Sequence, residues 1–297
     1  MTHKKNTRYY VPYGSNLNAP ELKHLRNISL GRPVARVIIP DRELAFTLHS
    51  SSRKGGVLDA RPALGSCITA LMYEVDESVQ EVIRAKEGSK YREFEGWVYT
   101  TSGERFWAYS YEVRPEYRQP FVKPDDYYFN VVRWAYKEHD LDPTPLEAAA
   151  RGESNGDRPL FTYGTLMAGD VRHPFLATFT QREGVPCETW GKLYTLGEYP
   201  ILVEHMRSKT LVPGETYLLS NHTEAFTLLD RVEGAREHTE RSPGYYRTPV
   251  VVATEARGRE VLVWCYVWWG ALPKGAKRIA GDRWVRKELV SSARTVH

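Results

Sequence analysis

Two short motifs in the sequence could take part in chemistry, and each of them occurs twice. Tyr-Gly-Ser at 13–15 and Tyr-Gly-Thr at 163–165 each end a short run of strand-forming residues. A glycine at a strand end lets successive backbone N–H groups point into one concavity, which can bind a carboxylate. Glu87-Gly88 and Glu233-Gly234 each close an amphipathic segment, where a partly desolvated carboxylate can act as a general base. The simpler alternatives are a plain glycine turn and a solvated glutamate.

The recurrence of both motifs in the same order indicates a tandem duplication. The two tyrosine turns lie 150 residues apart, and the two Glu-Gly pairs lie 146 residues apart. Residues 152–159 form a polar stretch with glycine and proline, which is typical of a linker. We therefore expect one domain over residues 1–150 and a second domain over residues 158–297.

The elements that must position these motifs are mostly strands. Runs rich in Val, Ile, Tyr, Phe and Trp predict strands at 8–13, 44–49, 66–75, 91–100, 104–113, 160–163, 189–196, 211–218, 246–253 and 260–268. Amphipathic spacing and capping residues predict helices at 20–30, 79–86, 125–139 and 224–231. Neither a strict strand–helix alternation nor a pure sandwich fits this order. The expected fold class is α+β, with two tandem small mixed β-barrel domains and few helices.

Composition and missing motifs narrow the function classes. The 297 residues carry a formal charge of +4 with no Lys/Arg run longer than two, so we expect no nucleic-acid partner. The longest apolar run is far shorter than the roughly 20 residues of a membrane span, and the first residues lack the apolar region of a signal peptide. Cys67, Cys187 and Cys265 lie far apart, which fits a reducing compartment. Without nucleotide-loop, zinc-helix or nucleophile-elbow motifs, we expect a cytoplasmic protein with no cofactor, no metal and no membrane partner.

The residues around these motifs resemble those of the gamma-glutamylcyclotransferases. In the first half the resemblance rests on Tyr-Gly-Ser-Asn-Leu at 13–17, the segments 51–57, 73–76 and 123–128, Glu87-Gly88 and Tyr91. The second half is similar to the related branch of gamma-glutamylamine cyclotransferases and avirulence-induced-gene-like proteins. That similarity rests on Tyr-Gly-Thr-Leu at 163–166, the segments 191–200, 229–234 and 264–268, and Tyr246-Arg247. Together the two resemblances cover nearly the whole chain.

The resemblance implies a substrate site in each half. The substrate-binding residues that it implies are Tyr13, Gly14, Ser15, Asn16, Leu17, Tyr91 and Tyr128 in the first half and Tyr163, Gly164, Thr165, Leu166 and Tyr246 in the second. The catalytic acid of the family falls on Glu87 and on Glu233. The implied reaction is a cyclisation, in which the α-amine of a γ-glutamyl group attacks its own γ-carbonyl. With glutamate as general acid and base, it releases 5-oxoproline and a free amine.

Some features of the sequence depart from the family pattern. Val11-Pro12 precedes the first turn, and Arg84 stands where the second half has Asp230, so we expect the second half to be the more active. The insertion at 235–244 lengthens a loop that we expect at the rim of the second pocket, where it could set substrate choice.

Two functions therefore stay open at this point. The leading one is a 5-oxoproline-forming enzyme, and the alternative is a non-catalytic small-molecule binding or regulatory protein that keeps the pocket. In a mixed case, one of the two domains would be active and the other would not. The substrate class (γ-glutamyl amino acid, γ-glutamylamine, glutathione or a biosynthetic intermediate) and the oligomeric state are not indicated by the sequence.

Overall fold

Long runs of β-branched and aromatic residues form a first barrel in the computed structural model, which describes residues 7–203, 205–253 and 260–285. Its strands are β1 (Arg8–Tyr10), β2 (Ala35–Ser50), β3 (Gly55–Val75), β4 (Tyr91–Tyr99) and β5 (Arg105–Val113). They close in the order β1-β3-β2-β4-β5. Strand β1 runs parallel to β5, and the other neighbouring pairs are antiparallel.

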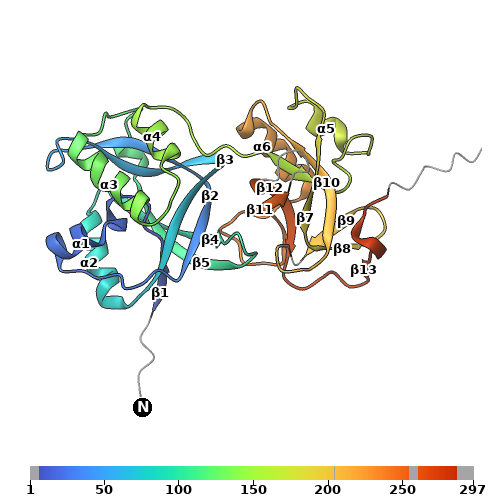
Figure 1. Ribbon diagram of the computed structural model, residues 1–297, viewed down its shortest axis with the longest axis horizontal. Helices are drawn as coiled ribbons and strands as arrows, with labels where there is room; N and C mark the ends of the chain where they lie inside the picture. Colours follow the sequence, from blue (N-terminus) through green and yellow to red (C-terminus); the bar gives the residue numbers. More distant parts are fainter. Residues whose placement is uncertain (1–6, 204, 254–259, 286–297) are drawn as a thin grey trace, which may run out of the picture.

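The second half forms a second closed barrel beside the first (Figure 1). Its strands are β6 (Leu160–Thr162), β7 (Val185–Trp190), β10 (Leu211–Tyr217), β11 (Gly244–Ala253) and β12 (Glu260–Trp269). Here β6 runs parallel to β12, as β1 does to β5. A small sheet of β8 (Lys192–Thr195), β9 (Pro200–Val203) and β13 (Lys277–Arg278) lies against this barrel. The predicted α+β fold with two small mixed barrels is confirmed.

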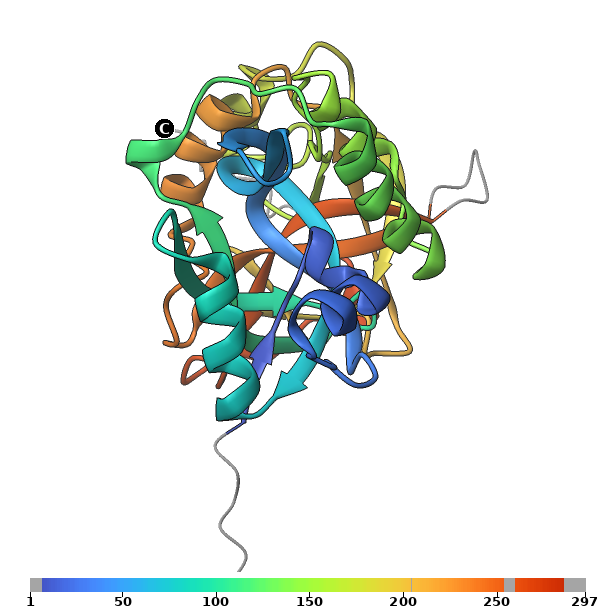
Figure 2. The same ribbon diagram turned by 90° about the vertical axis from the view of Figure 1, so that its left-hand side faces the viewer.

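The helices are few, and capping side chains start the two that lead to the candidate acids. The first half contains α1 (Ala19–Arg26), α2 (Glu77–Glu87), α3 (Asp126–Glu138) and α4 (Thr144–Ala150), and the second half contains α5 (His173–Ala177) and α6 (His222–Glu233). Asp76 caps α2 and Asn221 caps α6, each by accepting a hydrogen bond from a backbone N–H of the first turn. In Figure 1, α2 and α3 lie on the side of the first barrel that faces away from the second barrel, and Figure 2 shows that side toward the viewer. None of the helices in the described ranges is long and apolar enough to span a membrane.

The two barrels share a core and a buried ion cluster. Ile38 and Cys67 of the first barrel pack into the apolar cluster of Phe226 and Trp264 in the second. Arg247, which is 2% exposed, lies with Nη1 2.8 Å from an Asp41 oxygen and with Nε 3.0 Å from an Asp230 oxygen. A guanidinium held between carboxylates of both halves fixes the barrels against each other. We name Asp41, Arg247 and Asp230 the inter-barrel clasp.

The segment between the barrels is also fixed in place. The Cys67 N–H donates to the Gly156 carbonyl at 3.2 Å, and the Asn155 side chain donates to the Leu44 carbonyl at 2.9 Å. The linker predicted at 152–159 therefore lies along the first barrel through backbone and side-chain bonds. The domain bounds 1–150 and 158–297 stay predictions, and residues 1–6 and 286–297 lie outside the described residues.

Some predicted elements differ from the structure for local reasons. The strand expected at 44–49 is part of β2, which begins at Ala35 and passes a bulge between Pro40 and Arg42. The strand expected at 189–196 breaks at Gly191, where an added Cβ would lie 2.4 Å from a Leu202 methyl group. Close packing of β9 therefore requires the glycine and interrupts the strand.

Candidate functional site

The tyrosine turn and the Glu-Gly pair of the first half meet at one cavity of about 790 Å³. Its walls come from the turn at 13–16, the hairpin end at 48–53, the segment 86–91, and Tyr10, Val57, Leu58, Tyr111 and Tyr128. Ligand sites commonly have volumes of about 300–1,000 Å³. The structure therefore places both chemical motifs of the first half in one ligand-sized cavity, which we call the first cavity.

The turn itself is short and closed by its own backbone. The Leu17 N–H donates to the Gly14 carbonyl at 2.9 Å, so the amides of Ser15 and Asn16 take no part in that bond. Leu17 is 1% exposed, belongs to the apolar core, and is not among the lining residues of the first cavity. The expectation that Leu17 binds substrate through its amide is therefore wrong, because that amide is used within the turn.

Glu87 reaches the first cavity from the last residue of α2. Gly88 ends the helix with a φ of 72°, a conformation that glycine adopts without strain. The Glu87 side chain is 14% exposed, and its Oε1 accepts a hydrogen bond from Asn16 Nδ2 at 2.7 Å. Lys86 Nζ lies 4.0 Å from the same oxygen. A carboxylate is thus held within reach of the turn on the cavity wall.

Two of the predicted tyrosines form hydrogen bonds with the backbone of one β3 residue beside the first cavity. The Tyr91 hydroxyl donates to the Leu58 carbonyl at 2.9 Å, and the Leu58 N–H donates to the Tyr128 hydroxyl at 3.4 Å. Burial raises the pKa of Tyr91 well above its usual value and the pKa of Tyr128 to about 12. Both phenols therefore keep their protons near neutral pH and serve as hydrogen-bonding groups rather than bases.

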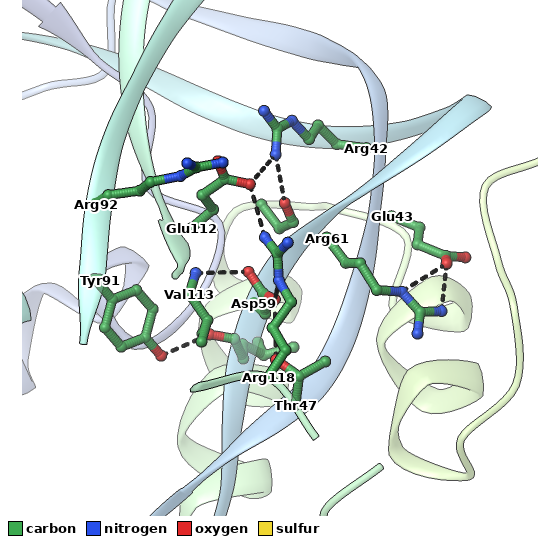
Figure 3. A network of polar contacts seen from close by, with 12 residues as sticks. Arg42, Glu43, Thr47, Asp59, Arg61, Tyr91, Arg92, Glu112, Val113 and Arg118 are labelled. Carbon is green, nitrogen blue, oxygen red and sulfur yellow. Dashed lines mark hydrogen bonds and ion pairs between the residues drawn. The ribbon is translucent and has the colours of Figure 1, made fainter. Parts of the chain in front are cut away.

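A network of buried ions supports this wall from behind (Figure 3). Asp59 follows Leu58 and accepts hydrogen bonds from the Thr47 hydroxyl at 2.9 Å and from Arg118 Nε at 2.8 Å. Arg118 also binds Glu112 at 2.7 Å, and two further arginines contact that carboxylate. Burial would raise the pKa of Glu112, but the arginines outweigh burial and hold the pKa below its usual value. The network fixes the part of β3 on which the two tyrosines act.

The equivalent site of the second half is almost filled. Tyr163, Gly164, Thr165, Leu166 and Glu233 line a space of about 20 Å³. A single water needs about 10–15 Å³ of such space, so no substrate of several atoms fits without movement. We call this space the second cavity.

Pro200 fills the place that stays open in the first half. A Cβ added at Gly164 would lie 2.3 Å from Pro200 Cγ, whereas a Cβ added at Gly14 would meet Leu58 Cδ1 at 3.5 Å. The second turn is therefore packed against β9, and the first turn faces the open first cavity.

Glu233 has a different partner from Glu87. Arg172 Nη1 lies 3.0 Å from Glu233 Oε1, and the Arg172 N–H donates to the Thr165 carbonyl at 2.9 Å. Burial raises the pKa of Glu233, and the neighbouring Arg172 partly opposes that shift. The second acid is thus held in an ion pair attached to its own turn.

The structure does not bring Tyr246 to the second cavity. The Tyr246 hydroxyl donates to the carbonyls of Glu240 and Ser242, on the side of the inserted loop. Its neighbour Tyr245 donates to the Pro200 carbonyl at 3.0 Å, as Tyr91 does to Leu58 in the first half. Successive strand residues face opposite sides, so the equivalent of Tyr91 is Tyr245, one position earlier than predicted.

The insertion at 235–244 docks on the first barrel instead of bordering the second cavity. The Trp97 N–H donates to the His238 carbonyl at 2.9 Å, and the Trp97 ring N–H donates to the Glu240 carbonyl at 2.6 Å. The Tyr99 hydroxyl lies 2.9 Å from His238 Nδ1. The expectation that this loop lies at the rim of the second pocket is wrong, because its backbone pairs with β4. The loop and the first barrel together enclose an inter-barrel cavity of about 700 Å³.

Within residues 7–203, 205–253 and 260–285, no group of three or more His, Cys, Asp or Glu side chains is arranged to hold a metal ion. Cys67, Cys187 and Cys265 are buried free thiols.

Comparison with known proteins gives a family match within the second half. Residues 160–286 match the family model described as "Gamma-glutamyl cyclotransferase, AIG2-like". No curated protein matches the chain.

Several solved structures are similar to parts of the chain. One titled "Gamma-glutamyl cyclotransferase" is 23% identical, covers 50% of this chain and 86% of its own, and has a TM-score of 0.42. An uncharacterized protein from Homo sapiens is 24% identical over 50% of this chain and 87% of its own, with a TM-score of 0.42. YkqA from Bacillus subtilis is 16% identical over 89% of this chain and 84% of its own, with a TM-score of 0.33. The family match therefore applies to residues 160–286, which are similar to gamma-glutamyl cyclotransferases of the AIG2-like type.

Proposed function

We propose that the protein is a cyclotransferase-type enzyme that converts a γ-glutamyl amide of an amine or amino acid into 5-oxoproline, and that the first cavity is where it does so. The family match of residues 160–286 supports a cyclotransferase-type function. One observation carries the choice of cavity: Glu87 lies beside the tyrosine turn on the wall of about 790 Å³ of open space.

The proposed reaction needs no nucleophile from the protein. The substrate α-amine attacks the γ-carbonyl carbon of the same glutamyl group, which forms the ring C–N bond and breaks the amide C–N bond. From its ammonium form the attacking nitrogen loses two protons, and the departing nitrogen gains two and leaves as an ammonium, so no water is consumed. Folding the substrate so that these atoms meet is the larger part of the task, and the cavity walls supply it.

The proposed roles follow from the residue types at the first cavity. An α-amine with a reference pKa of about 8 is mostly protonated near neutral pH, so a base must remove a proton before attack. Glu87 takes that proton and passes it to the leaving nitrogen, and it relays the second proton, which is lost as the ring C–N bond forms, in the same way. The amides of Ser15 and Asn16 bind the glutamyl carboxylate, and Tyr91 and Tyr128 hold the facing wall.

For the second barrel we propose a binding or structural role without turnover. The space of about 20 Å³ and the Arg172–Glu233 ion pair favour this second candidate function, because neither substrate nor a free base is accommodated. The protein would then have one active domain.

The test is 5-oxoproline release from a panel of γ-glutamyl amino acids, γ-glutamylamines and glutathione. We expect release by the wild-type protein and a loss of about 100-fold or more in Glu87→Gln, since a general base contributes that much. Glu81→Gln, an exposed glutamate on the same helix, is the matched control and should stay within about twofold of wild type. No release from any panel member, or full activity in Glu87→Gln, would contradict the proposal.

A further inference from the structure

The side chain of Asn16 lies at the centre of the first site. It is 6% exposed, and its Nδ2 donates to Glu87 Oε1 at 2.7 Å and to the Tyr10 hydroxyl at 2.7 Å. Lys86 Nζ donates to its Oδ1 at 2.5 Å. A primary amide has two N–H donors, and both are used here on named acceptors.

The partners fix which way this amide points. An ammonium can only donate, so the oxygen of the Asn16 amide must face Lys86. An ionised carboxylate can only accept, so the nitrogen must face Glu87. Exchanging the two ends would set donor against donor and acceptor against acceptor. The orientation therefore follows from chemistry as well as from the coordinates.

We infer that Asn16 is the positioning residue that orients Glu87 as the base of the first cavity, an inference that rests on the proposed function. The amide occupies Oε1, so exchange of a proton with the substrate nitrogen falls to Oε2. The same side chain is part of the turn whose backbone is proposed to bind the glutamyl group. One residue thereby sets the distance between the bound carboxylate and the base.

The second half shows what happens without this amide. Leu166 stands three residues after Tyr163, as Asn16 stands three residues after Tyr13. Leucine has no donor, and there the acid is paired with Arg172 at 3.0 Å. Glu87 accepts its short hydrogen bond from a neutral amide, with the Lys86 ammonium 4.0 Å away, whereas Glu233 is bound directly by a guanidinium. The two halves therefore give the acid different hydrogen-bond partners.

Other groups around Glu87 bear on any pH effect. The charged or titratable side chains that line the first cavity with it are His49, Arg53, Lys86, Lys90, Tyr10, Tyr13, Tyr91, Tyr111 and Tyr128. Arg53 is paired with Glu21, and burial raises the pKa of each of these tyrosines. None of these tyrosines changes charge in the acid range, so among the lining side chains only Glu87 and His49 can do so.

The experiment compares Asn16→Leu, the residue of the second half, with the nearly isosteric Asn16→Asp. We expect kcat to fall about 30-fold in Asn16→Leu with KM within about threefold, since positioning acts on the transition state. The acid limb of the kcat/KM profile should move up by about one pH unit in Asn16→Leu and further in Asn16→Asp, where a like charge faces Glu87. Asn130→Leu on the exposed face of α3 is the control for the substitution itself.

Failure of the inference can be told apart from failure of the proposed function. If both Asn16 variants lose activity but the acid limb stays in place, Asn16 is only structural and the inference is wrong. If the wild-type protein releases no 5-oxoproline, the proposed function fails. The inference is then decided by following the Glu87 carboxyl carbon with 13C NMR against pH, with Glu87→Gln to assign the signal. An unchanged titration in Asn16→Leu overturns it, and an upward shift supports it.

Discussion

The two barrels use the same internal bond and arrive at different cavities. The Tyr13 hydroxyl donates to the Tyr111 carbonyl and the Tyr163 hydroxyl to the Tyr266 carbonyl, each at 2.7 Å. Yet the first cavity has a volume of about 790 Å³ and the second about 20 Å³. The tyrosine of the turn therefore stabilises the fold in both barrels. The volume of each cavity depends on other residues.

The difference lies in what packs on the glycine of each turn. Leu58 of the long β2–β3 hairpin approaches Gly14 at ordinary contact distance, whereas Pro200 of the short strand β9 occupies the space beside Gly164. The motif departures in the first half predict the weaker site there, and the cavity volumes point the other way. A segment can keep its motif residues because they serve packing rather than catalysis.

Asp230 and Arg247 illustrate this in the second half. They belong to the motif segments of the resemblance, but both are used in the inter-barrel clasp. In the first half, Arg84 stands where Asp230 does, and Arg92 follows Tyr91 as Arg247 follows Tyr246. Arg92 pairs with Glu112 within its own barrel and is 46% exposed. The same motif position thus serves the junction in one half and a local network in the other.

The largest effect is expected from breaking the clasp. Arg247→Met leaves Asp41 and Asp230 near the junction without their cation, and removing one member of a buried ion pair costs about 3–5 kcal/mol. Arg92→Met, its counterpart in the first half, should cost less than about 1 kcal/mol because the arginine is half exposed. Urea unfolding of both variants measures the difference, and equal losses would remove the distinction.

A pH effect of nearly similar size is expected at the inserted loop, which only the second half carries. Burial lowers the pKa of His238 to about 4, with Arg247 adding to that shift and Asp41 opposing it. Between pH 6.5 and 4 the unfolded chain therefore binds a proton that the folded protein does not, so stability falls as the pH falls through this window, by up to about 3 kcal/mol.

The His238 effect can be isolated by substitution. His238→Gln should remove this share of the pH dependence of the unfolding temperature, while the exposed His24→Gln should leave it unchanged. Burial also lowers the pKa of His205, to about 3, so part of the dependence should persist in His238→Gln. An identical pH profile in His238→Gln and wild type would show that the loop does not carry this linkage.

Alanine at the two glycines tests the packing difference directly. Gly164→Ala drives a methyl group into Pro200 and should destabilise the protein by about 1–3 kcal/mol, as overpacking does. Gly14→Ala meets only ordinary contacts and should change the free energy of unfolding by less than about 1 kcal/mol. If Gly164→Ala were tolerated as well as Gly14→Ala, Pro200 would not be what closes the second cavity.

The smallest effect is expected at the second acid. Glu233→Gln should leave 5-oxoproline release within about twofold of wild type, in contrast to Glu87→Gln, because Glu233 is paired with Arg172 in a closed space. A loss comparable to that of Glu87→Gln would show that the second barrel opens and turns over substrate.

Local signals in the sequence predicted much of the frame that holds the acids. The caps Asp76 and Asn221 and the amphipathic segments after them predicted α2 and α6, and both acids lie at the ends of these helices. The turns at 13–16 and 163–166 were predicted from the glycine that follows each tyrosine. These features depend on residues close together in the chain, where capping and periodicity operate.

What could not be predicted depends on contacts between distant residues. Strand β9 has four residues and carries Pro200, so it gives little periodic signal, and its packing on Gly164 is non-local. Tyr245 and Tyr246 differ only in which side of β11 they face, and the preceding insertion hides the register. The inserted loop pairs with Trp97, more than 100 residues earlier in the chain. Residue types alone do not indicate which carboxylate contacts Arg172 and which contacts Asn16.

Because of the clasp and the fixed linker, the stability of each barrel depends on the other, as the stability of each subunit does in an obligate dimer. Asp41, Ile38 and Cys67 of the first barrel complete their surroundings only with residues of the second. Removing the second barrel would expose apolar surface of the first barrel and leave the Asp41 carboxylate without the Arg247 guanidinium. Dissociation has the same effect on a subunit of a permanent complex. The second barrel, whose own cavity is closed, therefore still stabilises the first barrel. We expect the two barrels to unfold in a single cooperative transition.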